Sequence, residues 1–185
     1  MKIKETLDFL LEADRLEAFP RMGYLMRGVP RPESVAAHVH GTIWVAMMLA
    51  DAIPGANVER TMRLALLHDL GEVRLTDIPY RGGLHFPPGV KDAAELSVAD
   101  ALRSKLGAAG ECYLDLFREY QAGQSLEARI VLAADKLQMI LKVVRYEQAG
   151  QRGLDDFWNT PENFRDHGLP LVADLFAELV ARRES

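Results

Sequence analysis

The chain has 185 residues, of which 49% are apolar and 26% charged, and its formal net charge is −5 at pH 7. This composition is typical of one globular domain with a sizeable core, and it excludes a disordered chain. The acidic balance argues against binding to a nucleic-acid polymer, which requires a basic surface, but not against binding a single nucleotide.

Cysteine content and hydropathy indicate the cellular compartment of the protein. Cys112 is the only cysteine, so neither an intramolecular disulfide nor a cysteine-based zinc site is possible. The N-terminal stretch carries acids throughout its apolar pattern, which excludes a signal peptide. No run reaches the roughly 20 apolar residues of a membrane span. We therefore expect a cytoplasmic protein with no membrane partner.

Helical periodicity is the regular pattern in the first part of the chain. Residues 2–18 predict an amphipathic helix. Residues 20–34 contain three prolines and two glycines and predict a long connection. Ser34 is placed to cap a helix that runs to about residue 53. The segment IWVAMMLA inside this helix is apolar on every side, so the helix should be central.

The rest of the chain continues the helical pattern after a turn at residues 51–57. A helix from about residue 58 to 70 delivers His68 and Asp69, and the proline- and glycine-rich residues 76–90 then predict a lid or pocket wall. Residues 150–168 predict a loop with at most one short turn. Further helices are expected over residues 91–107, 111–121, 125–149 (capped by Ser125) and 170–183. With no period-two alternation, the sequence predicts a single all-α domain spanning residues 1–185, with about six to eight helices.

Four polar side chains lie on or beside apolar helical stretches: His38, His68, Asp69 and Asp135. A buried imidazole or carboxylate is costly unless something offsets its desolvation, and a shared divalent metal ion would do so. Such a nitrogen and oxygen donor set suits Mn, Co, Fe, Ni or Zn and leaves positions open for water and substrate. Each residue alone has a simpler explanation, as a hydrogen-bonded core histidine or an aspartate paired with an arginine. Taken together, they favour a metal site built between helices.

The order of these residues resembles the H…HD…D signature of the HD-domain phosphohydrolase superfamily. Residues 20–38, 68–79 and 134–147 are similar to corresponding blocks of its 5′-deoxynucleotidase branch. The resemblance implies an all-helical fold, a divalent metal ion held by the four residues, and a homodimer. It also implies removal of the 5′-phosphate from nucleoside 5′-monophosphates, preferably deoxy, by attack of a metal-bound water.

The resemblance also assigns further residues. Its catalytic carboxylates fall on Glu72 and Asp77, and its substrate-binding residues on Arg21, Tyr24 and Asp77. Glu72 lies four residues after His68, so on a continued helix both would share one face. Asp77 also fits a simpler role as a turn or cap aspartate. The planar fork of Arg21 suits a phosphate, and its alternative is a surface charge in a loop.

The sequence leaves several points open. Tyr24 stands where the family commonly has tryptophan, which leaves the choice between deoxyribose and ribose undecided, and Ala37 stands where an acid commonly precedes the first ligand. Arg27 and Lys136 are additional substrate-binding candidates, and Lys136 is equally suited to pair with a ligand carboxylate. His40, His85 and His167 receive no role. The alternative functions are a phosphodiesterase or alarmone hydrolase on the same scaffold, a nucleotide-binding module without turnover, and a purely structural helical protein.

Overall fold

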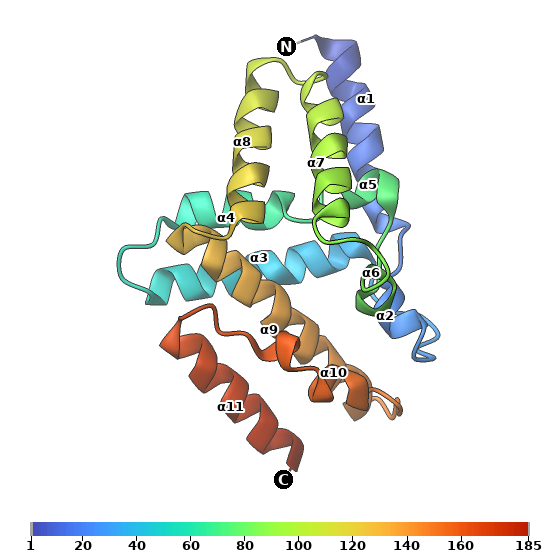
Figure 1. The fold of residues 1–185 in the computed structure, drawn as a ribbon, viewed down its shortest axis with the longest axis vertical. Helices are drawn as coiled ribbons and strands as arrows, with labels where there is room; N and C mark the ends of the chain where they lie inside the picture. The colour runs from blue at the N-terminus through green and yellow to red at the C-terminus, as the bar shows by residue number, and fades with distance from the viewer. Residues whose placement is uncertain (1, 185) are drawn as a thin grey trace.

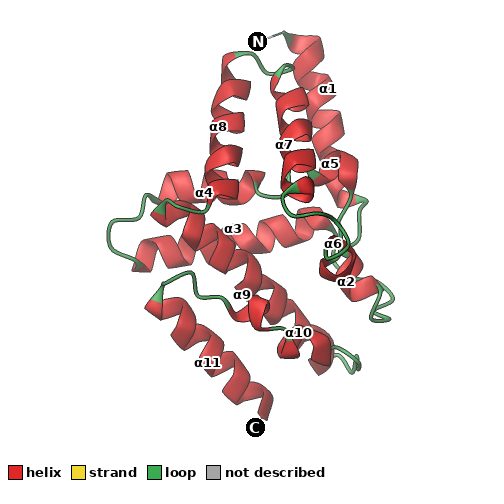
Figure 2. Cartoon of the chain, viewed as in Figure 1, coloured by secondary structure: helices red, strands yellow, loops and turns green. Residues whose placement is uncertain are grey.

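Helices make up the regular structure of the computed structural model, which describes residues 2–184 (Figures 1 and 2). Ten or more residues form each of α1 (Ile3–Ala13), α3 (Val35–Ala52), α4 (Val58–Leu67), α7 (Val90–Arg103), α8 (Ala108–Ala122), α9 (Leu126–Gln148) and α11 (Pro170–Glu184). Shorter elements are α2 (Met22–Leu25), α5 (Glu72–Leu75), α6 (Tyr80–Gly83), α10 (Asp155–Asn159) and the 3₁₀ turns η1 (Asp14–Glu17) and η2 (Pro161–Phe164). The described residues contain no strand. The all-α prediction is confirmed, although the short helices raise the number above six to eight.

Helices α3 and α9 form the centre of the molecule. In Figure 1, α3 and α4 lie across the middle beneath the upright α7 and α8, while α9 and α11 lie below them. Core positions on α9 such as Ile130, Val131 and Ala134 are fully buried, and so is Ala46 on α3. These small and branched side chains let the two helices approach closely, which brings polar residues of one within reach of the other.

Side-chain caps fix where the central helices begin. Ser34 Oγ accepts a hydrogen bond from the Ala37 amide at 3.2 Å, and Ser125 Oγ accepts one from the Ala128 amide at 3.1 Å. Each cap satisfies an amide that has no partner within its own helix. Both predicted caps are confirmed, and they set the position of His38 on α3 and of Asp135 on α9.

Helix α3 is also the one helix in residues 2–184 whose length and composition would allow it to cross a membrane. A core helix of a globular protein has the same composition, and seven residues of α3 are buried in this fold. Its buried face packs against α9 and α4, while Trp44 and Met48 on the same helix are exposed.

Several expected boundaries differ from the structure, and two of the differences affect packing or the cavity. The sequence predicts no helix over residues 108–110, between the helices expected at 91–107 and 111–121, but α8 already begins at Ala108. A Cβ atom on Gly110 would lie 2.1 Å from the Arg103 carbonyl oxygen, so this glycine allows the start of α8 to contact the end of α7. The expected loop over residues 150–168 contains α10 and η2, which cover one side of the cavity described below.

Candidate metal centre and active-site cavity

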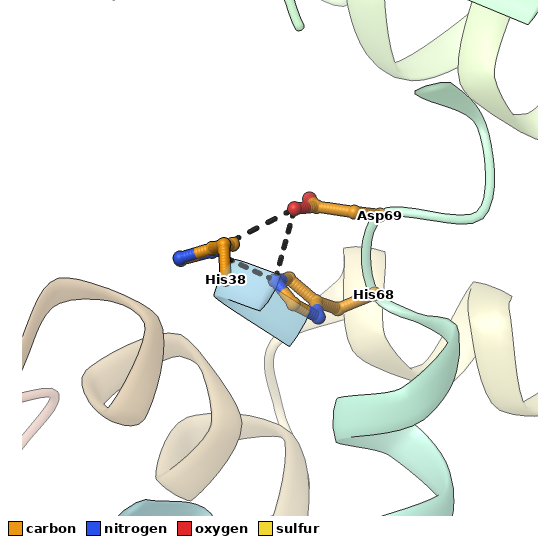
Figure 3. Close-up of side chains that lie close together, drawn as sticks. All are labelled: His38, His68 and Asp69. Carbon is orange, nitrogen blue, oxygen red and sulfur yellow. Dashed lines mark hydrogen bonds and ion pairs between the residues drawn. The ribbon is translucent and has the colours of Figure 1, made fainter. Parts of the chain in front are cut away.

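Two histidines from separate helices face each other at the centre of the fold (Figure 3). His38 on α3 is 0% exposed and His68, directly after α4, is 3% exposed, with their Nε2 atoms 3.3 Å apart. The Nδ1 atom of His38 lies 2.5 Å from Gln138 Oε1, and that of His68 lies 2.7 Å from the Ala65 carbonyl oxygen. Because these oxygens only accept hydrogen bonds, each Nδ1 carries the proton and each Nε2 presents a lone pair.

Two aspartates bring oxygen atoms to these imidazoles. Asp69 Oδ2 lies 3.3 Å from His68 Nε2 and 3.6 Å from His38 Nε2, and Asp135 Oδ1 lies 3.1 Å from His38 Nε2. The donor atoms of His38, His68 and Asp69 all lie within 4.8 Å of one another, and Asp135 joins them through His38. Asp69 Oδ2 is buried without a hydrogen-bond donor. Lone pairs and carboxylate oxygens gathered in this way repel one another, so this donor set fits a divalent cation.

The ionisation of the two aspartates favours cation binding, whereas protonation of His68 competes with it. Burial raises the pKa of Asp69, but His68, His38 and Arg21 outweigh burial and hold that pKa below its ordinary value. For Asp135, burial is outweighed mainly by Lys136 and His38, so its pKa is also well below the ordinary value. Burial lowers the pKa of His68, and the Asp69 carboxylate more than reverses this effect. The two aspartates are therefore ionised and supply negative charge at the centre.

Arg21 reaches the cluster from the predicted connection before α3. Its Nη1 donates to Asp77 Oδ1 at 2.9 Å and lies 3.6 Å from Asp69 Oδ2. The Arg21 amide donates to the Glu33 carbonyl oxygen at 2.9 Å, and this backbone pairing holds the segment against the start of α3. Arg21 is thus a partly buried residue of the site, with 15% of its side chain exposed, and not a surface charge.

Asp77 has both of its carboxylate oxygens engaged. One accepts from Arg21, and the other accepts from the Met22 amide at 2.5 Å, in the first turn of α2. The alternative role of Asp77 as a cap aspartate is therefore correct in geometry, although the helix that it caps lies 55 residues earlier in the chain. The same carboxylate holds the arginine toward the candidate metal centre.

Glu72 reaches the site by a different route from the one that the sequence suggested. Helix α4 ends at Leu67, before the expected end at about residue 70, so His68 and Glu72 do not share the face of one continued helix. A tight turn follows, in which the Glu72 amide donates to the Asp69 carbonyl oxygen at 3.0 Å, and α5 begins at Glu72. The Glu72 side chain is buried, and its Oε2 has no hydrogen-bond partner. Burial, together with the charges of Asp69 and Asp77, raises the pKa of Glu72 to about 10.

A cavity of about 670 Å³ opens over these residues. Acidic side chains contribute to its lining at the candidate metal centre, namely Asp69, Glu72, Asp77 and Asp135. The predicted wall within residues 76–90 is confirmed by Ile78, Pro79, Tyr80, Arg81 and Leu84, and further lining comes from α2, α9, α10 and η2. Ligand cavities of proteins commonly have this size.

Tyr24 is one of the residues that line this cavity, although only 2% of it is exposed. Its hydroxyl donates to the Met139 carbonyl oxygen at 3.0 Å, and its ring stacks on Phe157 with centroids 5.0 Å apart.

Lys136 lies 3.1 Å from Asp135 Oδ2, which confirms its role as partner of that carboxylate. Arg27 also lines the cavity, where it pairs with Asp156.

Several polar residues at or beside this cavity were not anticipated. Gln138 and Glu33 stand behind His38, Lys91 of α7 lines the cavity, and His167 also reaches it. Gln138 had a usable signal, because it is a polar residue within an apolar stretch of α9, three positions after Asp135. His40 is exposed on α3. His85 is not among the residues that line the cavity.

Comparison with known proteins gives an independent result. The profile of the HD domain family matches residues 13–166. The human protein named 5′-deoxynucleotidase HDDC2 is 31% identical over 186 residues, which cover 98% of this chain and 88% of that protein. A structure of a conserved hypothetical protein from Pyrococcus furiosus superposes with a TM-score of 0.79 at 34% identity, covering 95% of this chain and 99% of that one. The structure of the PH0347 protein from Pyrococcus horikoshii superposes with a TM-score of 0.75 at 36% identity, covering 91% of this chain and 99% of that one.

Proposed function

The chain belongs to the HD domain family, within its 5′-deoxynucleotidase group, and on this premise we propose that it removes the 5′-phosphate of deoxyribonucleoside 5′-monophosphates. The observation that carries the proposal is the meeting of two imidazole lone pairs and two ionised aspartates beside one cavity. A merely structural core would leave these groups repelling one another at considerable cost.

His38, His68, Asp69 and Asp135 would hold the divalent cation that the reaction needs. Their nitrogen and oxygen atoms are compatible with Mn, Co, Fe, Ni or Zn. When bound, such an ion acts as a Lewis acid that makes water a nucleophile near neutral pH and polarises a phosphoryl oxygen.

Arg21 and Asp77 act on the phosphate side of the reaction. Asp77 engages one amino group of Arg21, so the guanidinium is fixed while its other N–H groups remain available to phosphate oxygens. A cation held in this way stabilises the charge that grows on the phosphoryl group during attack by water. Asp77 therefore serves as a positioning residue for Arg21 and is also near enough to the cavity to receive a sugar hydroxyl.

Glu72 is suited to move the proton. Burial favours the neutral form of its carboxyl group, and in that form Glu72 would donate to the 5′-oxygen as the bond from that oxygen to phosphorus breaks. The carboxylate that remains can then take a proton from the attacking water. The products are a nucleoside and inorganic phosphate, and Glu72 returns to its starting state.

Tyr24 acts on the nucleoside side of the cavity. Because its hydroxyl is bonded to Met139, the residue offers a substrate its ring and not its oxygen. The stack with Phe157 fixes that ring as a flat apolar wall. We expect this wall to contact the sugar, where it would favour the less polar deoxyribose.

A substrate panel tests the proposal. Protein reconstituted with Mn²⁺ or Co²⁺ is incubated with deoxyribonucleotides, ribonucleotides, a cyclic dinucleotide and an alarmone, and released phosphate is measured beside a Glu72→Ala control. We expect the deoxyribonucleoside monophosphates to be hydrolysed fastest. Hydrolysis of the diester or alarmone alone would assign one of the other reactions of the scaffold, and nucleotide binding without phosphate release would indicate a binding module.

We further propose that the protein is a cytoplasmic homodimer. Helix α1 has no buried residue, and it exposes Ile3, Leu7, Leu10 and Leu11 at helical spacing along the outer edge of the molecule (Figure 1). Such a stripe is apolar surface that a second copy can cover. Sedimentation equilibrium should give a dimer for the wild type and a monomer for Leu7→Lys/Leu11→Lys, whereas a monomeric wild type at micromolar concentration would refute the dimer. Cell fractionation tests the location.

A further inference from the structure

A chain of polar contacts leads from His38 away from the cavity. Gln138 Oε1 lies 2.5 Å from His38 Nδ1, and Gln138 Nε2 lies 3.2 and 3.1 Å from the two carboxylate oxygens of Glu33. Lys142 Nζ lies 3.0 Å from Glu33 Oε2 and ends the chain near the surface. Gln138 is 6% exposed and the Glu33 side chain 3% exposed, so these bonds form away from competing water.

The direction of every hydrogen bond in this chain is dictated by Glu33. Its carboxylate can only accept, so the amide nitrogen of Gln138 must face it and the amide oxygen must face His38. That oxygen in turn accepts only, so His38 Nδ1 must carry the proton. Glu33 Oε1 is 3.9 Å from His38 Nδ1, which is too long for a direct hydrogen bond, so the effect passes through Gln138.

The packing of α3 against α9 makes room for this arrangement. A Cβ atom on Gly41 would lie 2.9 Å from both Cγ and Nε2 of Gln138. Any larger residue at position 41 would therefore push the amide away from its place beside α3. A glycine inside a helix is less stabilising than alanine, and its presence one turn after His38 leaves room for the Gln138 side chain.

We propose that Glu33 and Gln138 are positioning residues of the metal centre, which fix the tautomer and ring orientation of His38 so that its Nε2 lone pair points at the cation. The inference rests on the proposed metal binding. His68 needs no such device, because the Ala65 carbonyl oxygen performs the same task for it. Partners of this kind raise metal affinity by holding the ligand in its binding form.

The first test replaces the amide by a side chain of similar size. In Gln138→Leu, we expect Co²⁺ affinity, measured by chelator competition, to fall about 10- to 100-fold. Nitrogen-15 NMR of the metal-free protein should show His38 as the Nδ1–H tautomer in the wild type and as a mixture in the variant. Thr42→Val is the matched control, because Thr42 is fully buried one turn further along α3 and its hydroxyl has no hydrogen-bond partner. Unchanged affinity and tautomer in Gln138→Leu would overturn the proposal.

A rescue experiment separates positioning from simple packing. Glu33→Leu leaves Gln138 in place but removes the group that orients it, so the tautomer should become mixed even though Gln138 is intact. The double variant Glu33→Gln/Gln138→Glu exchanges the two groups and restores the order of donors and acceptors, so its Co²⁺ affinity should return to within a few-fold of the wild type. Failure of this rescue in a folded double variant would contradict the proposal. None of these readouts uses a nucleotide, so they are independent of whether the proposed hydrolysis is correct.

Discussion

His68 and Asp69 are neighbours in the chain, yet they are held in place by different parts of the backbone. His68 follows the last residue of α4, where helical carbonyl oxygens have no partner within the helix. One of these, from Ala65, accepts the hydrogen bond from the imidazole and so fixes the ring. Asp69 begins the turn that leads to Glu72, whose amide donates to the Asp69 carbonyl oxygen. The end of the helix therefore orients one candidate ligand, and the turn delivers the other together with Glu72, the proposed catalytic acid.

Replacing Glu72 by glutamine should remove proton transfer and leave the metal centre intact. Glutamine has the same shape but cannot give up a proton to the 5′-oxygen, so we expect kcat for deoxyribonucleoside monophosphates to fall by a factor of about 10² to 10⁴. Metal content, determined by elemental analysis of the same samples, should equal that of the wild type. A variant that retains its metal and loses less than about threefold in kcat would refute the role of Glu72.

The sequence allowed the candidate metal ligands to be predicted but not the way in which they are supported. His38, His68, Asp69 and Asp135 were recognisable because a charged or imidazole side chain in an apolar helix requires an explanation, and the structure brings them together. The link from Gln138 to Glu33 was missed, because which polar group lies opposite an amide depends on how α3 packs on α9. Such a contact joins residues 105 positions apart and leaves no periodic pattern.

At the level of elements, α7 rests directly on the turn that carries the candidate site. A Cβ atom on Gly71 would lie 2.8 Å from Cβ and 3.0 Å from Cα of Glu95. Glu95 in turn pairs with Lys91 at 3.2 Å, and Lys91 lines the cavity. The position of α7 therefore depends on the absence of a side chain at position 71. So does the position of the Lys91 side chain, which α7 contributes to the cavity. The same reasoning applies to Gly110, which was expected to lie between two helices. A sequence alone does not distinguish a glycine that permits close packing from a glycine that ends a helix.

Gly71→Ala should force α7 away from the turn. The nearest atoms are Cβ, Cγ and Cα of Glu95. Rotation of the Glu95 side chain can move Cγ but not Cβ or Cα, so we expect the free energy of unfolding to fall by about 1–3 kcal/mol. Urea denaturation followed by circular dichroism measures this change. Gly83→Ala is the matched control, because nothing lies within 4 Å of a Cβ atom at that helical position. Equal stability of the two variants would show that α7 adjusts freely.

Helix α1 is attached to the rest of the protein through Glu12, and this attachment should depend on pH. Glu12 pairs with Arg74 on α5 and, at 2.5 Å, with Lys105 after α7. The hydrogen bond from Arg74 is the largest influence, and with the contribution of Lys105 it outweighs burial and lowers the pKa of Glu12 from 4.5 to about 2. The carboxylate is therefore favoured in the folded state, so its contribution to stability is present above pH 4.5 and is lost as the pH falls toward 2.

Glu12→Gln should accordingly be less stable than the wild type at pH 7, by about 1 kcal/mol or less for a pair at the edge of the protein. The difference should shrink as the pH is lowered and vanish near pH 2, which urea denaturation at a series of pH values will show. Glu5→Gln on the same helix serves as the control, because its partner Lys2 is 80% exposed. A constant difference at all pH values would mean that packing, and not charge, is responsible.

For the molecule as a whole, the candidate metal ligands come from three separate segments of the core. His38 lies on α3, His68 and Asp69 follow α4, and Asp135 lies on α9, so one cation would connect three core helices. The unfolded chain offers no such site, and binding energy therefore adds to folding stability. A thousandfold excess of metal over its dissociation constant corresponds to about 4 kcal/mol. For a chain of this length, we expect the unfolding temperature to rise by roughly 8–16 °C on reconstitution with Mn²⁺ or Co²⁺ and to fall again with a chelator.

The response to metal should disappear when a candidate ligand is removed and persist when another histidine is removed. We expect no thermal shift for His68→Ala or Asp69→Ala, which lack one of the converging groups. His40→Ala is the matched control, since His40 lies on the same helix as His38 but is exposed and points to a different face. A shift of equal size in His68→Ala would place the bound metal elsewhere on the protein, and a wild type that melts at one temperature with and without metal would remove the basis of the proposed reaction. If the shift follows the ligands, the same cation that activates water also holds α3, α4 and α9 in the arrangement that forms the cavity.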